Sequence, residues 1–245
     1  MKKTLLAALA FAGFAAMNNA SAQSAYVDGD ALLVFRASGG TGASKNIQID
    51  LGNFSSKSFS SINLDLSSAS SILGLTYGSG WYSRNDISWG FIGANSADFS
   101  ATLGIKSGYS APAISLGDLN TVQMGVDNIR LAGAMGNAGQ GTVNGYAYSI
   151  YDTSNSGSFT AADDGGFGTV FSGTITAGIN QYSTLDLYQY GTDLDAFVSL
   201  SPVMTGSASI ASGVISVQAV PEPSTYALFG FGALILIVAY RRANA

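Results

Sequence analysis

The sequence predicts an all-β body, closed as a β-sandwich or a flattened barrel, with one short helix near residues 118–131. Residues that favour turns and strands are abundant, since 31 of the 245 residues are glycine, whereas the chain contains a single glutamate. Short alternating or apolar segments also recur between clusters of Gly, Ser and Asn. At this length an all-β chain is expected to form one main domain.

Strand candidates are short segments with alternating or continuous apolar character, separated by turn-forming clusters such as residues 38–42 and 163–166. No internal repeat of fixed period is present, which argues against a solenoid or propeller. The last candidate is expected to end in a short tether that reaches residue 220. The candidates are residues 31–36, 46–51, 87–93, 99–105, 143–151, 168–176, 183–190 and 207–218.

One segment has helical rather than alternating spacing of its apolar residues. Asp118 precedes most of this segment and is a candidate N-terminal cap. We therefore expect one helix over residues 118–131. The apolar positions are Leu116, Leu119, Val122, Val126 and Ile129.

The residue types that are absent exclude several classes of function. The chain has no His and no Cys, so disulfides, thiol nucleophiles, imidazole bases and the usual zinc ligands are excluded. Outside the termini, six basic residues face fourteen aspartates, a difference of −8. A surface that follows nucleic-acid phosphates needs the opposite sign, so no nucleic-acid partner is expected.

The N-terminus has the features of a signal peptide over residues 1–22. Lys2 and Lys3 precede an uncharged apolar run, residues 4–17, which we expect to be helical. Ala20 and Ala22 then form a small-x-small site for signal peptidase, with cleavage before Gln23. The general secretion machinery is therefore expected to export residues 23–219, referred to below as the body.

The C-terminus has the features of a membrane anchor. Residues 226–240 are uncharged and overwhelmingly apolar, and Arg241 and Arg242 follow directly. As a helix this run is about 22 Å long, which spans a bilayer marginally and suits a temporary anchor. We assign a single transmembrane helix to residues 225–240 and a basic stop to the two arginines. Basic residues stay in the cytoplasm, so the body is expected outside it.

A proline-rich motif stands immediately before this anchor: Val220, Pro221, Glu222, Pro223 and Ser224. The order of motif, apolar helix and basic stop over residues 220–245 resembles the PEP-CTERM sorting domain. The two prolines remove backbone donors and favour an extended form that a protease can bind, with Glu222 as the charged determinant.

That resemblance implies an exosortase as the processing partner. It also implies a Gram-negative bacterium, a precursor anchored in the inner membrane, and delivery to the cell surface or to an extracellular matrix of exopolysaccharide, as in a biofilm. Residues 30–42, 81–90 and 185–188 are similar to segments of other PEP-CTERM surface proteins. Those proteins form an uncharacterised class, so this similarity implies a location without a chemistry.

No enzymatic motif is present in the body, and we expect a protein without catalytic activity. Ser-x-x-Lys, Gly-x-Ser-x-Gly and Gly-Lys pairs are all absent. The fourteen aspartates provide no privileged pair for hydrolysis, although a secreted Asp-dependent hydrolase is kept as an alternative.

Two binding hypotheses arise from the body. Asp152, Ser154, Ser156, Ser158 and Asp163 have the spacing of a calcium loop, with Gly157 at the turn and Thr160 at a further ligand position. No other cofactor is expected. The second hypothesis is a carbohydrate-binding surface module, in which Trp81, Tyr82 and Trp89 stack on sugar rings while Arg84 and Asp86 bind hydroxyl groups. A hairpin loop and a hydrophobic core are the respective alternatives.

Overall fold

The computed structural model describes residues 27–54, 61–133, 139–155, 158–162, 177–178, 183–193 and 198–219. These residues are mainly β. Their strands are β1 Asp30–Ala37, β2 Lys45–Asn53, β3 Ile62–Asp65, β4 Ile87–Asn95, β5 Ser100–Lys106, β6 Gly139–Val143, β7 Tyr146–Asp152, β8 Ala177–Gly178, β9 Thr184–Tyr190, β10 Thr192–Asp193, β11 Val198–Ser199, β12 Val203–Ala211 and β13 Val214–Ala219.

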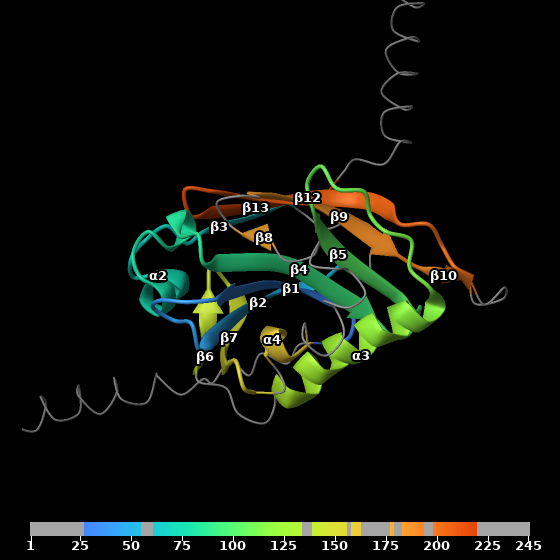
Figure 1. Cartoon of the computed structure of the whole chain (residues 1–245), viewed down its shortest axis with the longest axis horizontal. Helices are drawn as coiled ribbons and strands as arrows, with labels where there is room; N and C mark the ends of the chain where they lie inside the picture. The colour runs from blue at the N-terminus through green and yellow to red at the C-terminus, as the bar shows by residue number, and fades with distance from the viewer. Residues whose placement is uncertain are drawn as a thin grey trace, which may run out of the picture.

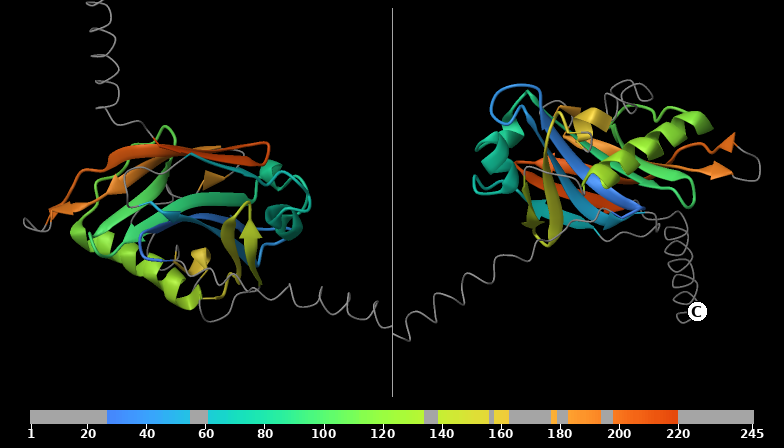
Figure 2. Two further views of the ribbon diagram at one scale, coloured as in Figure 1. Left: turned by 180° about the vertical axis from the view of Figure 1, so that it is seen from behind. Right: turned by 90° about the horizontal axis from the view of Figure 1, so that it is seen from below.

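One long antiparallel sheet curls into a nearly closed, barrel-like shape (Figures 1 and 2). Its strand order is β3-β13-β12-β9-β5-β4-β1-β2-β7-β6, and β8 pairs with β4 off this path. β10 and β11 form a separate two-stranded ribbon. The prediction of a mainly β fold that curls toward a barrel is therefore confirmed.

Several predicted strands lie where they were expected, and others are divided by turns. β1, β2, β4 and β9 contain most or all of the candidates at 31–36, 46–51, 87–93 and 183–190. The candidate at 143–151 corresponds mainly to β7, with its first three residues in the end of β6 and the turn before β7. The candidate at 207–218 is wrong as a single strand, because it contains a turn with two residues at positive φ and folds as a hairpin. The candidate at 168–176 lies outside the described residues.

The predicted helix is present and longer than expected: α3 spans Leu116–Gly133. The cap is Ser115 and not Asp118. The Ser115 hydroxyl accepts the Asp118 N–H at 3.1 Å, while the Asp118 carboxylate accepts the Ser115 N–H at 2.9 Å. This reciprocal arrangement is a capping box, and its hydrogen bonds lower the pKa of Asp118.

Three short helical segments were not predicted. They are α2 Ile72–Tyr77, the 3-10 helix η1 Trp81–Ser83, and α4 Phe159–Ala162. The predicted N-terminal and C-terminal helices, at residues 1–22 and 225–240, lie outside the described residues. Within the part of the chain that the structure describes, no helix is long and apolar enough to cross a membrane.

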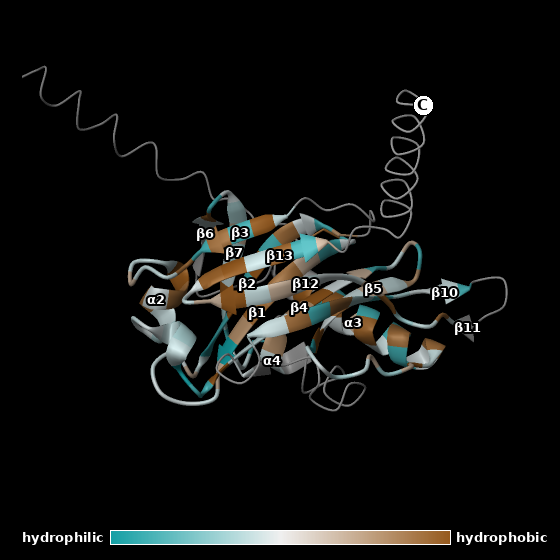
Figure 3. Cartoon of the chain, turned by 90° about the horizontal axis from the view of Figure 1, so that it is seen from above, coloured by the Kyte–Doolittle hydropathy of each residue, from teal (hydrophilic) through white to brown (hydrophobic). Residues whose placement is uncertain are grey.

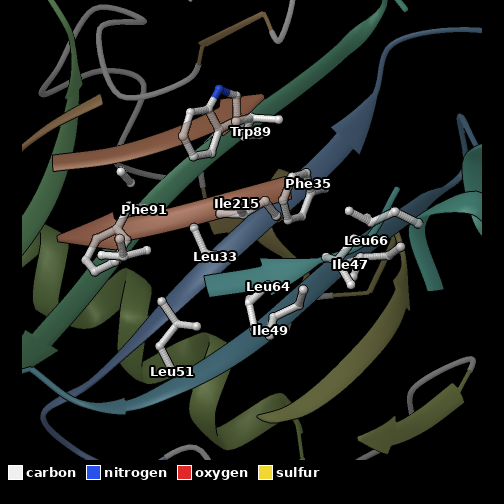
Figure 4. Close-up of a cluster of buried hydrophobic side chains, with 14 of the residues drawn as sticks. Leu33, Phe35, Ile47, Ile49, Leu51, Leu64, Leu66, Trp89, Phe91 and Ile215 are labelled. Carbon is white, nitrogen blue, oxygen red and sulfur yellow. The ribbon is translucent and has the colours of Figure 1, made fainter. Parts of the chain in front are cut away.

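Two hydrophobic clusters hold the fold together. The inner cluster fills the barrel and includes Leu33, Phe35, Trp89, Phe91 and Ile215, all fully buried (Figure 4). The outer cluster packs the other face of β1, β4 and β5 against α3 and α4. β1 is covered on both faces, which explains its continuous apolar sequence.

The body has two distinct ends. α2 lies at one end and the β10–β11 ribbon projects at the other (Figures 1 and 3). The turn of the β12–β13 hairpin lies at the α2 end, because a Cβ on Gly213 would stand 2.6 Å from the Cα of Ser67. β13 therefore runs away from α2 and ends at Ala219. We call these the α2 end and the tail end.

Candidate processing site at the end of the last strand

The β12–β13 hairpin positions the last residues before the sorting motif. Its turn residues, Ser212 and Gly213, have φ of 50° and 83°. Two consecutive residues at positive φ match the right-handed twist of the flanking strands and set the register. Ala211 consequently pairs with Val214, and the ladder continues in register to Gly206 and Ala219.

β13 is an interior strand of the sheet. It pairs with β12 along its whole length and with β3 from Val214 to Val217. Ile215 and Val217 are fully buried in the inner cluster. The expected tether before residue 220 is therefore wrong, since the chain belongs to the sheet as far as Ala219.

The motif follows this strand without a spacer. Val220 is joined directly to Ala219, and residues 220–224 lie outside the described residues. Glu222 is at most about 11 Å from the Cα of Ala219 even in a fully extended chain. A protease that binds the motif must therefore work within a few residues of a folded sheet.

The other predicted sorting residues also lie outside the described part of the chain. They are the signal peptidase site at Ala20, Ala22 and Gln23, and the basic stop at Arg241 and Arg242.

The predicted sugar-stacking residues lie in the core. Trp81 and Trp89 are fully buried, and the Trp81 indole N–H donates to the Leu66 carbonyl at 3.0 Å. Trp81 also packs edge-on against Phe35, and Trp89 belongs to the cluster in Figure 4. Neither indole has a face available to a sugar, so that prediction is wrong for both. Tyr82 is half-buried against Trp81.

The predicted hydroxyl-binding pair is occupied by the protein itself. The Arg84 guanidinium donates to the carbonyls of Gly39, Thr41 and Tyr77 and to the Asp86 carboxylate. These bonds fasten the loop after β1 onto the end of α2, and the bond from Arg84 holds the pKa of Asp86 below its usual range. Arg84 and Asp86 act here as a clasp between loops.

The described members of the calcium loop do not converge. Asp152 pairs with Lys45 across the β2–β7 ladder. Ser158 is fully buried and donates to the Thr153 carbonyl, while Thr160 donates to the Asn46 side chain at 3.0 Å. These hydroxyls bond to the protein, so the described residues form a turn and not a cation site. Ser154 is exposed, and Ser156, Gly157 and Asp163 lie outside the described residues.

Two carboxylates, those of the buried Asp30 and the half-buried Asp50, were not singled out by the sequence. Burial raises the pKa of Asp50 to about 6, and the neighbouring Asp30 adds to the rise. Burial also raises the pKa of Asp30. Their burial could have been inferred from the sequence, because both aspartates lie inside or beside apolar strand segments. A nearby cavity beside Gly29 and Gly93 measures about 10 Å³, which is room for one water molecule and no substrate.

Comparison with known proteins identifies the tail. Residues 219–243 match the family model described as the PEP-CTERM protein-sorting motif. No curated protein and no solved structure matches the chain. The match begins at Ala219, the last residue of β13, so the motif and the folded body adjoin. The chain therefore carries a PEP-CTERM sorting motif, which indicates a secreted protein that is anchored in a membrane and then processed by an exosortase.

Proposed function

We propose that the chain is a non-enzymatic surface or matrix module that an exosortase detaches from its membrane anchor close to the end of β13. The observation that carries this proposal is the junction itself. Paired strand extends to Ala219, and the sorting motif begins at the adjoining residue. A cut within residues 220–224 removes the anchor and leaves every described strand intact.

The membrane anchor in this proposal is a helix over residues 225–240, stopped by Arg241 and Arg242. Its apolar run is short for a bilayer, which suits a segment that is held only until processing. The body then reaches the cell surface or an exopolysaccharide matrix of a Gram-negative bacterium, as the resemblance of the tail implies.

The chemistry of the body supports a role without catalysis. The Arg84 guanidinium donates to the Asp86 carboxylate and to nearby backbone carbonyls, and Lys45 pairs with Asp152. The carboxylates of Asp30 and Asp50 accept backbone N–H groups from Val27 and Gly52. These charges therefore serve the fold, and the cavity beside Gly29 is too small for a substrate.

Replacing Pro221, Glu222 and Pro223 together by alanine tests this function. The expected result is a precursor that stays in the membrane with residues 225–245 attached, read from the C-terminal mass of the purified protein. Pro202→Ala is the matched control, because it removes a proline outside the motif, at the position directly before β12. An unchanged mature C-terminus in the triple variant would refute motif-directed processing.

Delivery to the matrix needs its own measurement. The protein is expected in the matrix fraction of cells that make exopolysaccharide and in the culture medium of cells that do not. An equal distribution in both strains would remove exopolysaccharide from the proposal and leave sorting in place.

A further inference from the structure

Exposed apolar side chains gather at the tail end of the body. Phe99, Leu200, Val203 and Met204 are 38%, 51%, 62% and 42% exposed. We call these four residues the apolar rim. All four border the segment 188–192, where β9 ends and the β10–β11 ribbon begins. Apolar side chains that lie together on the surface of a secreted domain are candidates for a contact with a partner or a membrane.

Strand pairing and hydrogen bonds place the four rim residues around that segment. Val203 and Met204 pair with Gln189 and Tyr188 of β9. The Leu200 N–H donates to the Gly191 carbonyl at 2.9 Å, and the Thr192 hydroxyl donates to the Phe99 carbonyl at 3.4 Å. The rim therefore follows one border of the body, next to the projecting ribbon in Figure 3.

Phe99 is presented at a conformational cost. Its φ is 47°, in the left-handed region where residues with a Cβ are disfavoured by about 1 kcal/mol or more. It occupies the turn between β4 and β5, where glycine or asparagine would be relaxed. A strained aromatic residue with an exposed ring indicates that the ring serves a contact outside the folded body.

The membrane anchor begins beside this rim. Ala219 pairs with Gly206 of β12. Met204 precedes Gly206 by two positions, so about 7 Å of strand separates these two residues. Residues 220–225 separate Ala219 from the apolar run at 226–240. Seven extended steps reach at most about 24 Å, so the tail end must face the bilayer in the anchored precursor.

We infer that the apolar rim rests on the lipid surface of the membrane while the precursor is anchored; this inference rests on the anchoring in the proposed function. The short link formed by residues 220–225 holds the rim at an effective concentration on the order of millimolar, so weak apolar contacts suffice. Cleavage near Glu222 breaks this link, and the same weak contacts no longer hold the body. The rim thus orients the junction during processing and permits release afterwards.

The charges around the rim define the lipid that it suits. Asp98 and Asp193 adjoin Phe99 and Thr192 and are exposed, whereas Lys106 pairs with Leu185 at the opposite end of β9. Acidic neighbours are repelled by anionic headgroups. The rim therefore suits a zwitterionic surface, and phosphatidylglycerol is expected to weaken its contact.

Single fluorescent labels on the anchored precursor test the inference. The chain has no cysteine, so Leu200→Cys and Val203→Cys each accept one NBD group, with Leu75→Cys on α2 as the matched exposed control. The full precursor, residues 23–245, is reconstituted in phosphatidylcholine vesicles that contain doxyl-labelled lipid. Circular dichroism verifies that each variant is folded, and flotation verifies anchoring.

The expected result is quenching and a blue shift of both rim labels, with the Leu75 label unchanged. Adding phosphatidylglycerol should reduce the quenching. Precursor that floats with unquenched rim labels overturns the inference while leaving the anchor intact, and so does equal quenching of all three labels. Rim labels that become protected only when exosortase is added would assign the rim to the enzyme and overturn the lipid contact. Failure to float refutes the anchor and the inference together.

Discussion

The two ends of the body differ in how completely their side chains are buried or hydrogen-bonded. At the α2 end, Trp81 is fully buried and hydrogen-bonded to Leu66, and Arg84 joins three loop carbonyls to Asp86. At the tail end, Phe99 is strained and exposed, Val203 is largely exposed, and the half-buried Asp50 has a raised pKa. Polar side chains with several partners are thus concentrated at the α2 end, although that end also holds the exposed Leu75 and Ser212 at positive φ.

The difference between the two ends indicates which part of the body is suited to contacts with other molecules. Unfavourable features persist in proteins mainly where they serve a contact or a transition. Phe99, Val203 and Asp50 share the end from which the sorting motif leaves. Substitutions at the α2 end should therefore destabilise the body, whereas substitutions at the tail end should have little effect or stabilise it.

The largest expected effect is that of Trp81→Ala. Removing the indole leaves a cavity in the inner cluster and removes one of the two hydrogen bonds to the Leu66 carbonyl, the other coming from the Ser71 hydroxyl. Unfolding should therefore become easier by about 3 to 5 kcal/mol. Urea denaturation followed by circular dichroism measures this change. Val203→Thr at the tail end is the control and should change stability by less than about 0.5 kcal/mol. Similar losses in both variants would remove the contrast between the two ends.

Gly213→Ala should have the next largest effect. The residue has φ of 83°, and its new Cβ would stand 2.6 Å from the Cα of Ser67. Gly145→Ala is a matched control, because φ there is 84° and no atom lies within 4 Å of the new Cβ. The control should lose about 1 to 2 kcal/mol from backbone strain alone. Gly213→Ala should lower the free energy of unfolding by about 1 to 3 kcal/mol more than the control. Equal losses in the two variants would show that the contact with Ser67 does not contribute to stability.

Arg84→Lys should destabilise the α2 end by about 2 kcal/mol. Lysine keeps the charge but cannot reach Asp86 and the carbonyls of Gly39, Thr41 and Tyr77 at once. The comparison is Lys45→Met, which removes an exposed ion pair with Asp152 and should lose less than about 1 kcal/mol. Thermal unfolding of the two variants compares the clasp with a surface pair, and an unchanged melting temperature for Arg84→Lys would contradict the role of the clasp.

Asp50→Asn should stabilise the body at pH 7.5 by about 1 to 2 kcal/mol. The folded-state pKa of Asp50 is about 6 and lies above its unfolded value, so the folded state holds the proton more tightly. Its contribution to stability is present below about pH 4 and is lost as the pH rises through 6. The asparagine oxygen can still accept the Gly52 N–H.

Urea unfolding at pH 4.5 and pH 7.5 measures this difference. The two proteins should converge at the lower pH and separate at the higher one. Asp65→Asn is a control of opposite sign, because hydrogen bonds from Ser67 lower the pKa of Asp65 and its contribution is lost as the pH falls. A gain for Asp50→Asn that is the same at both pH values would contradict the assignment to ionisation.

The parts of the fold that are local in sequence were predictable, and the parts that depend on distant contacts were not. β1, β4 and β9 were recognised because apolar patterning reports burial directly. The hairpin β12–β13 was read as a single strand, and the candidate at 143–151 ran through the turn before β7, although Asn144-Gly145 and Ser212-Gly213 have the composition of tight turns. Alternation continues through such a short turn, so it conceals the reversal of direction.

The site shows the same division. The sorting motif is a linear signal, so residues 220–224 could be named from sequence, and the family match at 219–243 covers them. The contacts of Arg84 could not be predicted, because its partner Gly39 lies 45 positions away. The role of the aromatic residues was ambiguous for a related reason. A tryptophan in a β domain can lie in the core or on a sugar-binding face, and the sequence does not distinguish the two positions. Only the packing of Trp81 and Trp89 decides between them.

The interior position of β13 has a mechanical consequence. A pull transmitted through the C-terminal anchor enters the body along the axis of that strand, between β12 on one side and β3 on the other. Such a load acts in shear on both ladders, so many hydrogen bonds bear it together instead of opening one after another. An anchored precursor exposed to fluid drag would therefore keep its fold until the enzyme, and not the force, separates it from the cell.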